Sequence, residues 1–396
     1  MEWERTKASV RELPLAPSLM WWSLSGALAL MIGALLFLLH ASGTVPALAN
    51  IDIWQLSLAV PGAWLLMLSL RGWWLVRATD EYVFLQNEAQ FAQEQWEAWA
   101  GRHLAILAGS VQLPDGLTAA VIHEPSAAIP SRGGLTRRMA HIHDPLKLCL
   151  AGVEEALSTL PPDLPLRVTL VSDSPVAQLT ETFARHWASR FPLREPPDDI
   201  TVTASLSLQR MAERLKQPEL TVDLILLMQL NGGEAYSDWL ASLLLTSDDV
   251  ALIHNLAHPA RLLRPMALDM AAFERGFTLF LETQMVACTS VRTLADALSW
   301  EKSAAPLMTT GARCGAAWQP AERLVMEKLC GIPGPMAPWL VVVLASELVR
   351  LSKVSMLTLF SSGTEHYVST VTSGDEDANN GYSARPFGAR WDVNSH

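Results

Sequence analysis

The chain has 396 residues, of which half are hydrophobic and 17% are charged, and its formal net charge is -11. Soluble proteins average about 25% charged residues, so the apolar excess must be concentrated in particular segments. The acidic balance excludes nucleic acid as the main partner, because phosphate binding depends on Lys and Arg. Four irregularly spaced cysteines form no CxxC motif and no disulfide framework, which favours a reducing compartment.

Two uncharged runs near the N-terminus hold much of this excess. They cover 21 residues at 19–39 and 18 residues at 53–70. A helix of about 20 residues spans the hydrocarbon core of a bilayer, so we expect a two-span transmembrane helical hairpin over 19–76. A cleaved signal peptide for the first run and a buried hairpin of a soluble protein are the alternatives. Tryptophans border both runs, as is typical of a membrane interface, namely Trp21, Trp22, Trp54, Trp73 and Trp74.

The distribution of basic residues predicts the orientation of this hairpin. Residues 1–18 contain three Lys or Arg, residues 71–79 contain two, and the connecting loop 40–52 contains none. Because Lys and Arg are enriched on the cytoplasmic side, both termini are expected inside the cell. The sequence therefore predicts a multi-pass membrane protein with both termini in the cytoplasm and the lipid bilayer as one partner.

A helical stalk is expected at 77–107, after the second span. Acidic residues in its first turn suit the helix dipole, and aromatic residues recur at roughly helical spacing. One interpretation is a helix whose aromatic side chains pack on the soluble body. The other is a stalk that continues the second span and presents an aromatic stripe to a protein partner. The candidates for partner binding are Phe84, Phe91, Trp96 and Trp99.

From residue 146 onward the pattern alternates between strand and helix periods. It predicts a cytoplasmic α/β layered domain at 146–371 with a mostly parallel sheet, preceded by a connecting region at 108–145. The expected strands are 117–123 (within the connecting region), 167–171, 200–204, 222–230, 250–256 and 285–289, with a closing hairpin at 354–361 and 366–371. The expected helices are 147–160, 175–191, 206–216, 239–245, 271–282, 320–329 and 338–351.

A polar tail is expected at 372–396. Near its end lie Phe387, Arg390 and Trp391, which belong to residue types enriched at binding hot spots. The tail is interpreted either as a docking peptide for a protein partner or as a disordered end that binds nothing.

No P-loop, GxGxxG, GxSxG or HExxH signature occurs in the chain. The best metal candidate is the pair His141 and His143 with Asp144, to which the upstream His123 could add a ligand. Alternating histidines on a strand would face the same way and share a divalent ion. Exposed or capping polar side chains are the simpler interpretation.

Cys288 is the cysteine that we consider as a nucleophile, provided that a histidine lies beside it. His254 and His258 are the histidines that a structure should test for this role. A small buried apolar cysteine, with both histidines in a loop, is the simpler interpretation.

Two polar segments follow expected strands, at 172–174 (Ser-Asp-Ser) and at 231–234 (Asn-Gly-Gly-Glu). The carboxyl ends of strands are where α/β folds bind ligands, although helix capping also explains the first segment. Because no signature joins a nucleophile, a base and an orienting group, we predict no catalytic residue, no cofactor and no metal site.

The arrangement of a basic N-terminus, a tryptophan-bordered hairpin and a large acidic α/β body resembles accessory inner-membrane proteins of bacterial type VI secretion systems. The resemblance implies that the membrane is the bacterial inner membrane. That family includes adaptors that bring lipase effectors to the secretion machine. The resemblance implies a non-catalytic adaptor or scaffold that recruits a protein partner at the cytoplasmic face, such as an effector or a machine component.

The α/β body also resembles a thiolase or ketosynthase unit, through Gly232-Gly233-Glu234-Ala235 ahead of Leu243-Leu244-Leu245. Such folds carry a catalytic cysteine with histidine partners, and no cysteine here occupies a comparable turn. The resemblance implies a fold that is kept without its chemistry. The alternative function is a membrane-tethered enzyme that acts on an acyl or lipid-linked substrate at the strand ends.

Overall fold

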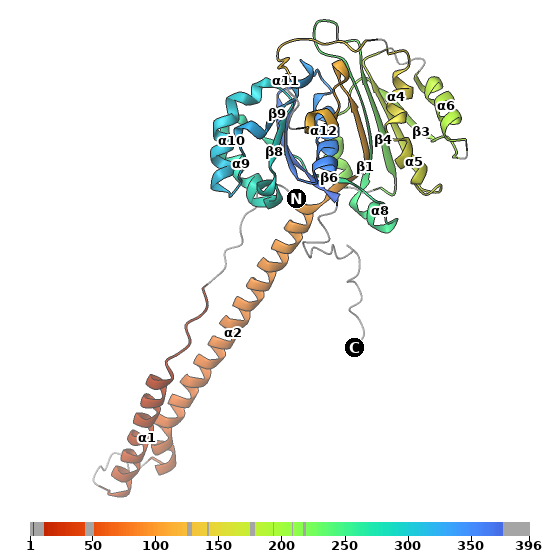
Figure 1. Ribbon diagram of the computed structural model, residues 1–396. Helices are drawn as coiled ribbons and strands as arrows, with labels where there is room; N and C mark the ends of the chain where they lie inside the picture. Colours follow the sequence, from red (N-terminus) through yellow and green to blue (C-terminus); the bar gives the residue numbers. More distant parts are fainter. Residues whose placement is uncertain are drawn as a thin grey trace. The chain divides into compact units, whose positions relative to one another are not determined.

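The computed structural model describes residues 3, 12–43, 51–124, 129–140, 142–174, 179–192, 194–207, 209–216 and 219–374 (Figure 1). The chain divides into two compact units. The hairpin unit comprises residues 5–96, and the body comprises residues 97–396 together with residues 1–4.

The hairpin unit contains α1 (Leu19–Ala41) and most of α2 (Ile53–Gly101). Both helices are long and apolar enough to cross a membrane, and only 17% and 6% of their apolar windows are buried. A core helix of a soluble protein would be mostly buried, so the structure disfavours that alternative. A signal sequence passes the same test of length and composition, so membrane insertion stays a prediction.

The two helices pack closely through a face of small residues on α1. Gly26, Ala29 and Gly33 are its buried residues. A Cβ atom on Gly26 would lie 2.8 Å from the Trp64 ring, and one on Gly33 would lie 2.5 Å from the carbonyl oxygen of Ser57. The small residues therefore serve contact within this hairpin, where missing side chains let two helices approach closely.

α2 continues without a break through residue 77, where the expected stalk begins. The Thr79 hydroxyl donates to the carbonyl of Leu75 at 2.8 Å, as a residue inside a helix does. The helix ends at Gly101, so the prediction of helix to residue 107 is wrong. Residues 104–107 are an apolar run that suits a helix or a buried strand, and pairing with two neighbouring strands decides for the strand.

The strands of the body form one mixed sheet in the order β3-β2-β4-β5-β1-β6-β11-β10-β8-β9, with β7 paired to β11. Their bounds are β1 His103–Gln112, β2 Leu166–Ser172, β3 Asp199–Thr203, β4 Val222–Gln229, β5 Trp239–Ser247, β6 Ala260–Leu263, β7 Met266–Leu268, β8 Arg292–Ala295, β9 Arg323–Val325, β10 Met356–Ser362 and β11 Glu365–Ser373. The α/β class is confirmed.

The prediction of a mostly parallel sheet is wrong. Among the described residues, only the pairs β2–β3, β2–β4, β8–β9 and β8–β10 are parallel. The pairs β4–β5, β1–β5, β1–β6, β6–β11, β7–β11 and β10–β11 are antiparallel. In each half, the strands nearest the middle of the sheet are antiparallel to their neighbours. An alternation of helices and strands along the sequence does not reveal the direction of these strands.

The strand order shows that the sheet consists of two halves with the same topology. The first half runs β3-β2-β4-β5-β1 and the second runs β6-β11-β10-β8-β9. With β7 set aside, the second half repeats the first in reverse order. The corresponding strands are β1 and β6, β5 and β11, β4 and β10, β2 and β8, and β3 and β9. The parallel and antiparallel pairs correspond as well, so β2 matches β8 and β4 matches β10.

Helix α12 (Ala337–Ser352) packs on the middle of this sheet, against β1, β6, β10 and β11 (Figure 1). Most of its residues are buried, as expected of a helix that is apolar all round. The remaining helices are α3 Ala119–His123, α4 Pro145–Ala151, α5 Glu154–Thr159, α6 Leu179–Arg190, α7 Gln209–Lys216, α8 Asp248–Ile253, α9 Phe273–Thr283, α10 Ala304–Arg313 and α11 Met326–Cys330.

Several expected elements exchange type in the structure. Residues 239–245 form the buried strand β5 where we expected a helix, and residues 250–256 contain most of α8 where we expected a strand. The Ser247 hydroxyl accepts from the amide of Val250 and caps α8, which accounts for the second error. Residues 285–289 form a 3₁₀ turn (η5), residues 117–123 contain α3, and residues 320–329 are divided between a 3₁₀ turn, β9 and α11.

Candidate functional site

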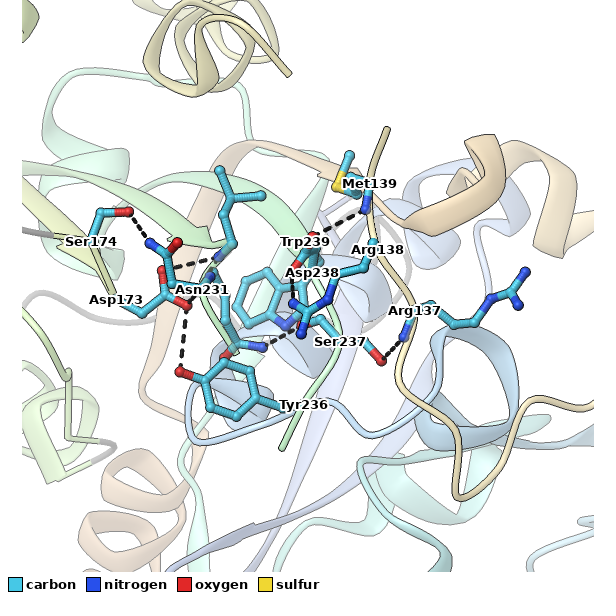
Figure 2. A network of polar contacts seen from close by, with 12 residues as sticks. Arg137, Arg138, Met139, Asp173, Ser174, Asn231, Tyr236, Ser237, Asp238 and Trp239 are labelled. Carbon is cyan, nitrogen blue, oxygen red and sulfur yellow. Dashed lines mark hydrogen bonds and ion pairs between the residues drawn. The ribbon is translucent and has the colours of Figure 1, made fainter. Parts of the chain in front are cut away.

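Asp173 follows β2 directly and joins it to the end of β4. Its amide donates to the carbonyl of Met228 at 3.3 Å. Its carboxylate accepts from the amides of Leu230 at 3.0 Å and Asn231 at 2.7 Å (Figure 2). The Asn231 side chain donates to the hydroxyl of Ser174 at 2.6 Å. The two polar segments that the sequence analysis treated separately, 172–174 and 231–234, therefore lie together.

A second set of contacts holds the other end of the β4–β5 loop. The Asp238 carboxylate accepts from the amide of Met139 at 3.1 Å and pairs with Arg138, and the Ser237 hydroxyl accepts from the amide of Arg137 at 3.1 Å (Figure 2). Segment 137–139 belongs to the expected connecting region. It is fixed to the sheet by these bonds.

A buried glutamine completes the network below the loop. The Gln229 side-chain amide donates to the carbonyls of Ser237 at 2.9 Å and Pro333 at 2.8 Å, and Trp239 donates to the same Pro333 carbonyl at 3.0 Å. Gly334 has a φ of +76°, and a Cβ there would lie 2.7 Å from the Gln229 amide nitrogen. The missing Cβ of Gly334 therefore lets the backbone pack directly against the Gln229 side chain.

The chemistry of this network is structural. The Asp173 carboxylate is occupied by two backbone amides and lies 3.4 Å from the hydroxyl of Tyr236. Burial, and then the charge of Asp173, raise the pKa of the Tyr236 phenol. A phenol with a raised pKa stays protonated at neutral pH, so it can donate a hydrogen bond but offers no base.

The second half of the body has an aspartate in the matching place. Asp296 follows β8, and its amide donates to the carbonyl of Leu359 at 3.0 Å. Its carboxylate accepts from the amide of Ser361 at 2.7 Å and from the indole of Trp300 at 2.8 Å. Burial is the largest influence and raises the pKa of this carboxyl from 3.8 to about 6.

Asp173 and Asp296 have the same backbone relation to the neighbouring strand. Each amide donates to the carbonyl of one residue, Met228 or Leu359, and each carboxylate accepts the amide two residues further on, at Leu230 or Ser361. Because β2 matches β8 and β4 matches β10, this is one interaction formed twice. We call it the aspartate latch.

The latch at Asp296 has further polar neighbours that the sequence analysis missed. Ser361 pairs with His366 across β10 and β11, and the His366 ring lies edge-on to Trp300 with centroids 5.3 Å apart. Within the described residues the Ser361 hydroxyl is buried without a hydrogen-bond partner. The sequence signal for Asp296 was an aspartate directly after a strand. The strand 292–295 is too short to be recognised from its sequence pattern.

The structure does not join Cys288 to the histidines proposed for it. Burial, and then the neighbouring Cys314, raise the pKa of the Cys288 thiol, which disfavours a thiolate. The ring nitrogens of His258 lie 3.0 Å from the Leu256 carbonyl and 3.1 Å from the Arg261 guanidinium. Within the described residues, no hydrogen bond links Cys288 with His254 or His258.

The other cysteines are poorer nucleophiles. Burial raises the pKa of both Cys149 and Cys330 to about 12. Both thiols therefore stay protonated at neutral pH, as is typical of cysteines that only fill space in a core.

The expected metal ligands do not gather in the described part of the chain. Asp144 caps α4 by accepting from the amide of Lys147 at 3.1 Å, and it lies 2.8 Å from His186. His143 is exposed, and His141 lies outside the described residues. No group of three His, Cys, Asp or Glu side chains within those residues is placed to hold a metal ion.

The tryptophans expected at a membrane interface lie mostly on the surface of the hairpin unit. Trp21, Trp54, Trp73 and Trp74 are exposed, whereas Trp22 is half-buried with its ring 6.2 Å from that of Trp64. An arginine lies over the ring of two of them. The guanidinium of Arg71 lies 4.6 Å from the Trp74 ring centroid, and that of Arg77 lies 5.6 Å from the Trp73 ring centroid. Exposed Trp beside Arg is the composition found where a helix leaves a bilayer.

The expected partner-binding residues differ in exposure. Phe84 and Phe91 are 62% and 58% exposed, whereas Trp96 and Trp99 are half-buried. Trp99 belongs to the body, where the guanidinium of Arg264 lies 4.4 Å from its ring centroid. Phe387, Arg390 and Trp391 lie outside the described residues, so their role stays a prediction.

Comparison with known proteins gives a likeness of fold only. No protein-family model matches the chain, and no curated protein matches it. A ketosynthase in complex with its acyl-carrier protein from a type II polyketide synthase is similar over 69% of this chain and 99% of that chain, with a TM-score of 0.45 and 10% identity.

Two further solved structures show the same level of similarity. OleA of Xanthomonas campestris, as a variant bound with cerulenin, has a TM-score of 0.44 and 13% identity over 70% of this chain and 98% of that chain. An oxazolomycin ketosynthase domain from Streptomyces albus has a TM-score of 0.43 and 14% identity over 69% and 95%. At these TM-scores and identities, no role and no functional residue of these neighbours is transferred to this chain.

Proposed function

We propose that this chain is an adaptor of the bacterial inner membrane. In this proposal α1 and the first part of α2 cross the bilayer, both termini lie in the cytoplasm, and the α/β body with the polar part of α2 binds a protein partner. The partner that we propose, from the resemblance in architecture, is an effector or a component of a type VI secretion machine.

The observation that carries the proposal is the occupied strand end beside Asp173. Its carboxylate, the Asp238 carboxylate and the amide nitrogen of Gln229 are all bonded to the protein's own backbone, so these groups hold the loop in place. Cys149 and Cys330 are kept protonated by burial. A body of this kind offers a folded surface for recognition, and Phe84 and Phe91 supply exposed aromatic contacts.

A pull-down of the full-length chain from detergent extract tests the proposal. We expect the F84A/F91A double variant to recover at least tenfold less of a specific protein partner than the wild type, because truncated aromatic anchors weaken an interface strongly. The matched control is L252A/I253A, which removes an equally exposed apolar pair on α8. Absence of any specific partner from the wild type, or equal recovery from both double variants, contradicts the proposal.

The group around Asp296 favours a second candidate, a membrane-tethered enzyme that acts on an acyl or lipid-linked substrate. A buried carboxyl with its pKa raised to about 6, a serine hydroxyl without a partner and a histidine lie near one strand end. Perturbed carboxyl groups are more frequent at catalytic sites. Hydrolysis of p-nitrophenyl acyl esters by the wild type, abolished by S361A and by H366A, is the result expected of this enzyme; equal rates in all three chains exclude it.

A further inference from the structure

Trp3, sixteen residues ahead of α1, lies in the body. Its ring centroid is 5.5 Å from that of Trp99 in an edge-on arrangement and 6.0 Å from that of Phe280. Trp3 is half-buried and packs against the apolar cluster that contains Phe277 and Phe280. Edge-on and tilted aromatic pairs at these separations are attractive.

The surface that contacts Trp3 is fixed by Arg264, which packs on the Trp99 ring. Arg264 is 2% exposed, covers the Trp99 ring, and donates to the Trp99 carbonyl at 3.3 Å. The Gln284 side chain donates to the Arg264 carbonyl at 2.8 Å, which joins this arginine to the end of α9. Phe280 in α9 is fully buried. Trp3 therefore meets a preformed aromatic surface, so little ordering of the receiving side is needed.

The chain between residue 3 and the first apolar helix is long enough for this contact in a membrane-inserted protein. Fifteen residues lie between Trp3 and Leu19. An extended chain covers about 3.3 Å per residue, so this segment can span roughly 50 Å. Helix α2 rises roughly 33 Å between Arg77 and Trp99 at about 1.5 Å per residue. The segment can therefore reach from the border of the first span to the body.

We propose that the surface formed by Trp99 and Phe280 is a docking site for the protein's own N-terminus, and that Trp3 is its occupant. Docking closes a loop that contains the whole membrane hairpin, so the body is attached to both ends of the hairpin. Because residue 3 and residues 97–374 must then lie on one side of the bilayer, the number of crossings between them is even. The inference does not depend on which partner the body binds.

The covalent connection of Trp3 to the rest of the chain explains why its contact with only two rings can persist. A second copy of the chain would lose translational and rotational freedom on binding, whereas an attached N-terminus is already present at high effective concentration. A free peptide with the same tryptophan should accordingly bind the surface only weakly. The proposed occupant is thus intramolecular, and an intermolecular contact is an outcome that the experiment must distinguish.

Photo-crosslinking of the full-length chain in native membranes tests the proposal. With benzoylphenylalanine at position 3, we expect crosslinks to the tryptic peptides 78–102 and 276–292, which contain Trp99 and Phe280. The matched control places the crosslinker at Leu15, which is 88% exposed, and should leave peptide 276–292 unmodified. In a mixture of heavy and light isotope-labelled chains, adducts should be heavy–heavy or light–light.

Two results would overturn the proposal. One is the absence of crosslinks from position 3 to either peptide, and the other is a set of mixed heavy–light adducts in proportion to the mixture. Hydrogen exchange gives an independent readout, because W3A should exchange several-fold faster in peptide 276–292 while W3F resembles the wild type. Equal exchange in all three chains would also contradict docking of Trp3.

Discussion

At the scale of single residues, two aspartates show how one local interaction can be used twice with different surroundings. The Asp173 carboxylate accepts from the amide of Leu230, and the Asp296 carboxylate accepts from the amide of Ser361. In each case this amide lies two residues beyond the carbonyl that accepts from the aspartate's own amide. Asp296 is 2% exposed and also accepts from Trp300, whereas Asp173 borders a polar loop. The ionised aspartate of the latch therefore destabilises the folded state more in the second half, because a buried carboxylate loses its hydration.

The raised pKa of Asp296 gives a pH-dependent contribution to stability. The folded carboxyl has a pKa of about 6 and the unfolded one 3.8, so the folded state binds the proton more tightly. The ionised group destabilises the folded state by about 3 kcal/mol at neutral pH, and this penalty is relieved as the pH falls through 6.

We therefore expect the wild type to gain about 1 kcal/mol over D296N when the pH is lowered from 7 to 5. The comparison with D296N at each pH removes the effect of the other carboxyl groups. Thermal unfolding of the detergent-solubilised full-length chain measures it. Parallel pH profiles of the two chains would show that Asp296 does not titrate in this range.

At the scale of elements, the α1–α2 hairpin depends on missing side chains. Gly33 faces the Ser57 carbonyl and the Pro61 ring, with 2.5 and 3.0 Å between those atoms and a Cβ built on the glycine. A larger residue there must push the helices apart, since neither a backbone carbonyl nor a proline ring can rotate away. Gly62 of α2 has no atom within 4 Å of such a Cβ.

G33L should therefore separate the two helices, at a cost of roughly 1–3 kcal/mol, whereas G62L should not. Crosslinking of an F37C/W54C pair with a short bismaleimide reports this directly, because the Phe37 and Trp54 ring centroids are 5.9 Å apart in the hairpin. The yield is expected to fall in the G33L background and to stay at the parental level in G62L. A high yield in both backgrounds would mean that the close approach at Gly33 is not required.

At the scale of the whole molecule, the two apolar helices and the location of Trp3 lead to the same expectation. The basic residues of 1–18 and 71–79 predict cytoplasmic termini, and the contact of Trp3 with Trp99 requires that both regions share one side. These observations are independent, since one rests on charge and the other on aromatic packing.

Alkaline phosphatase, which is active only outside the cytoplasm, tests this topology. We expect it to be active when inserted in the loop 40–52 and inactive when fused after residue 396. A fluorescent protein fused at the C-terminus should fold and remain in the membrane fraction. Active phosphatase at the C-terminus, or recovery of the intact chain as a soluble protein, would contradict a two-span hairpin.

The sequence alone determined those features that depend on composition along the chain. Hydropathy located the runs at 19–39 and 53–70, and period and turn chemistry located β2, β4, α12 and the closing hairpin. In each of these the local pattern and the tertiary environment agree, so no distant contact is needed to choose the structure.

Only the tertiary structure decided the rest, because distant pairing chose between local patterns of similar strength. Residues 103–112 and 239–247 are apolar runs that suit either a helix or a buried strand, and their pairing with each other makes both strands. The aspartate latch needs two parallel strands in register, and the docking of Trp3 needs the N-terminus beside residues 97–101 and α9. Neither relation is present in any segment of the chain by itself.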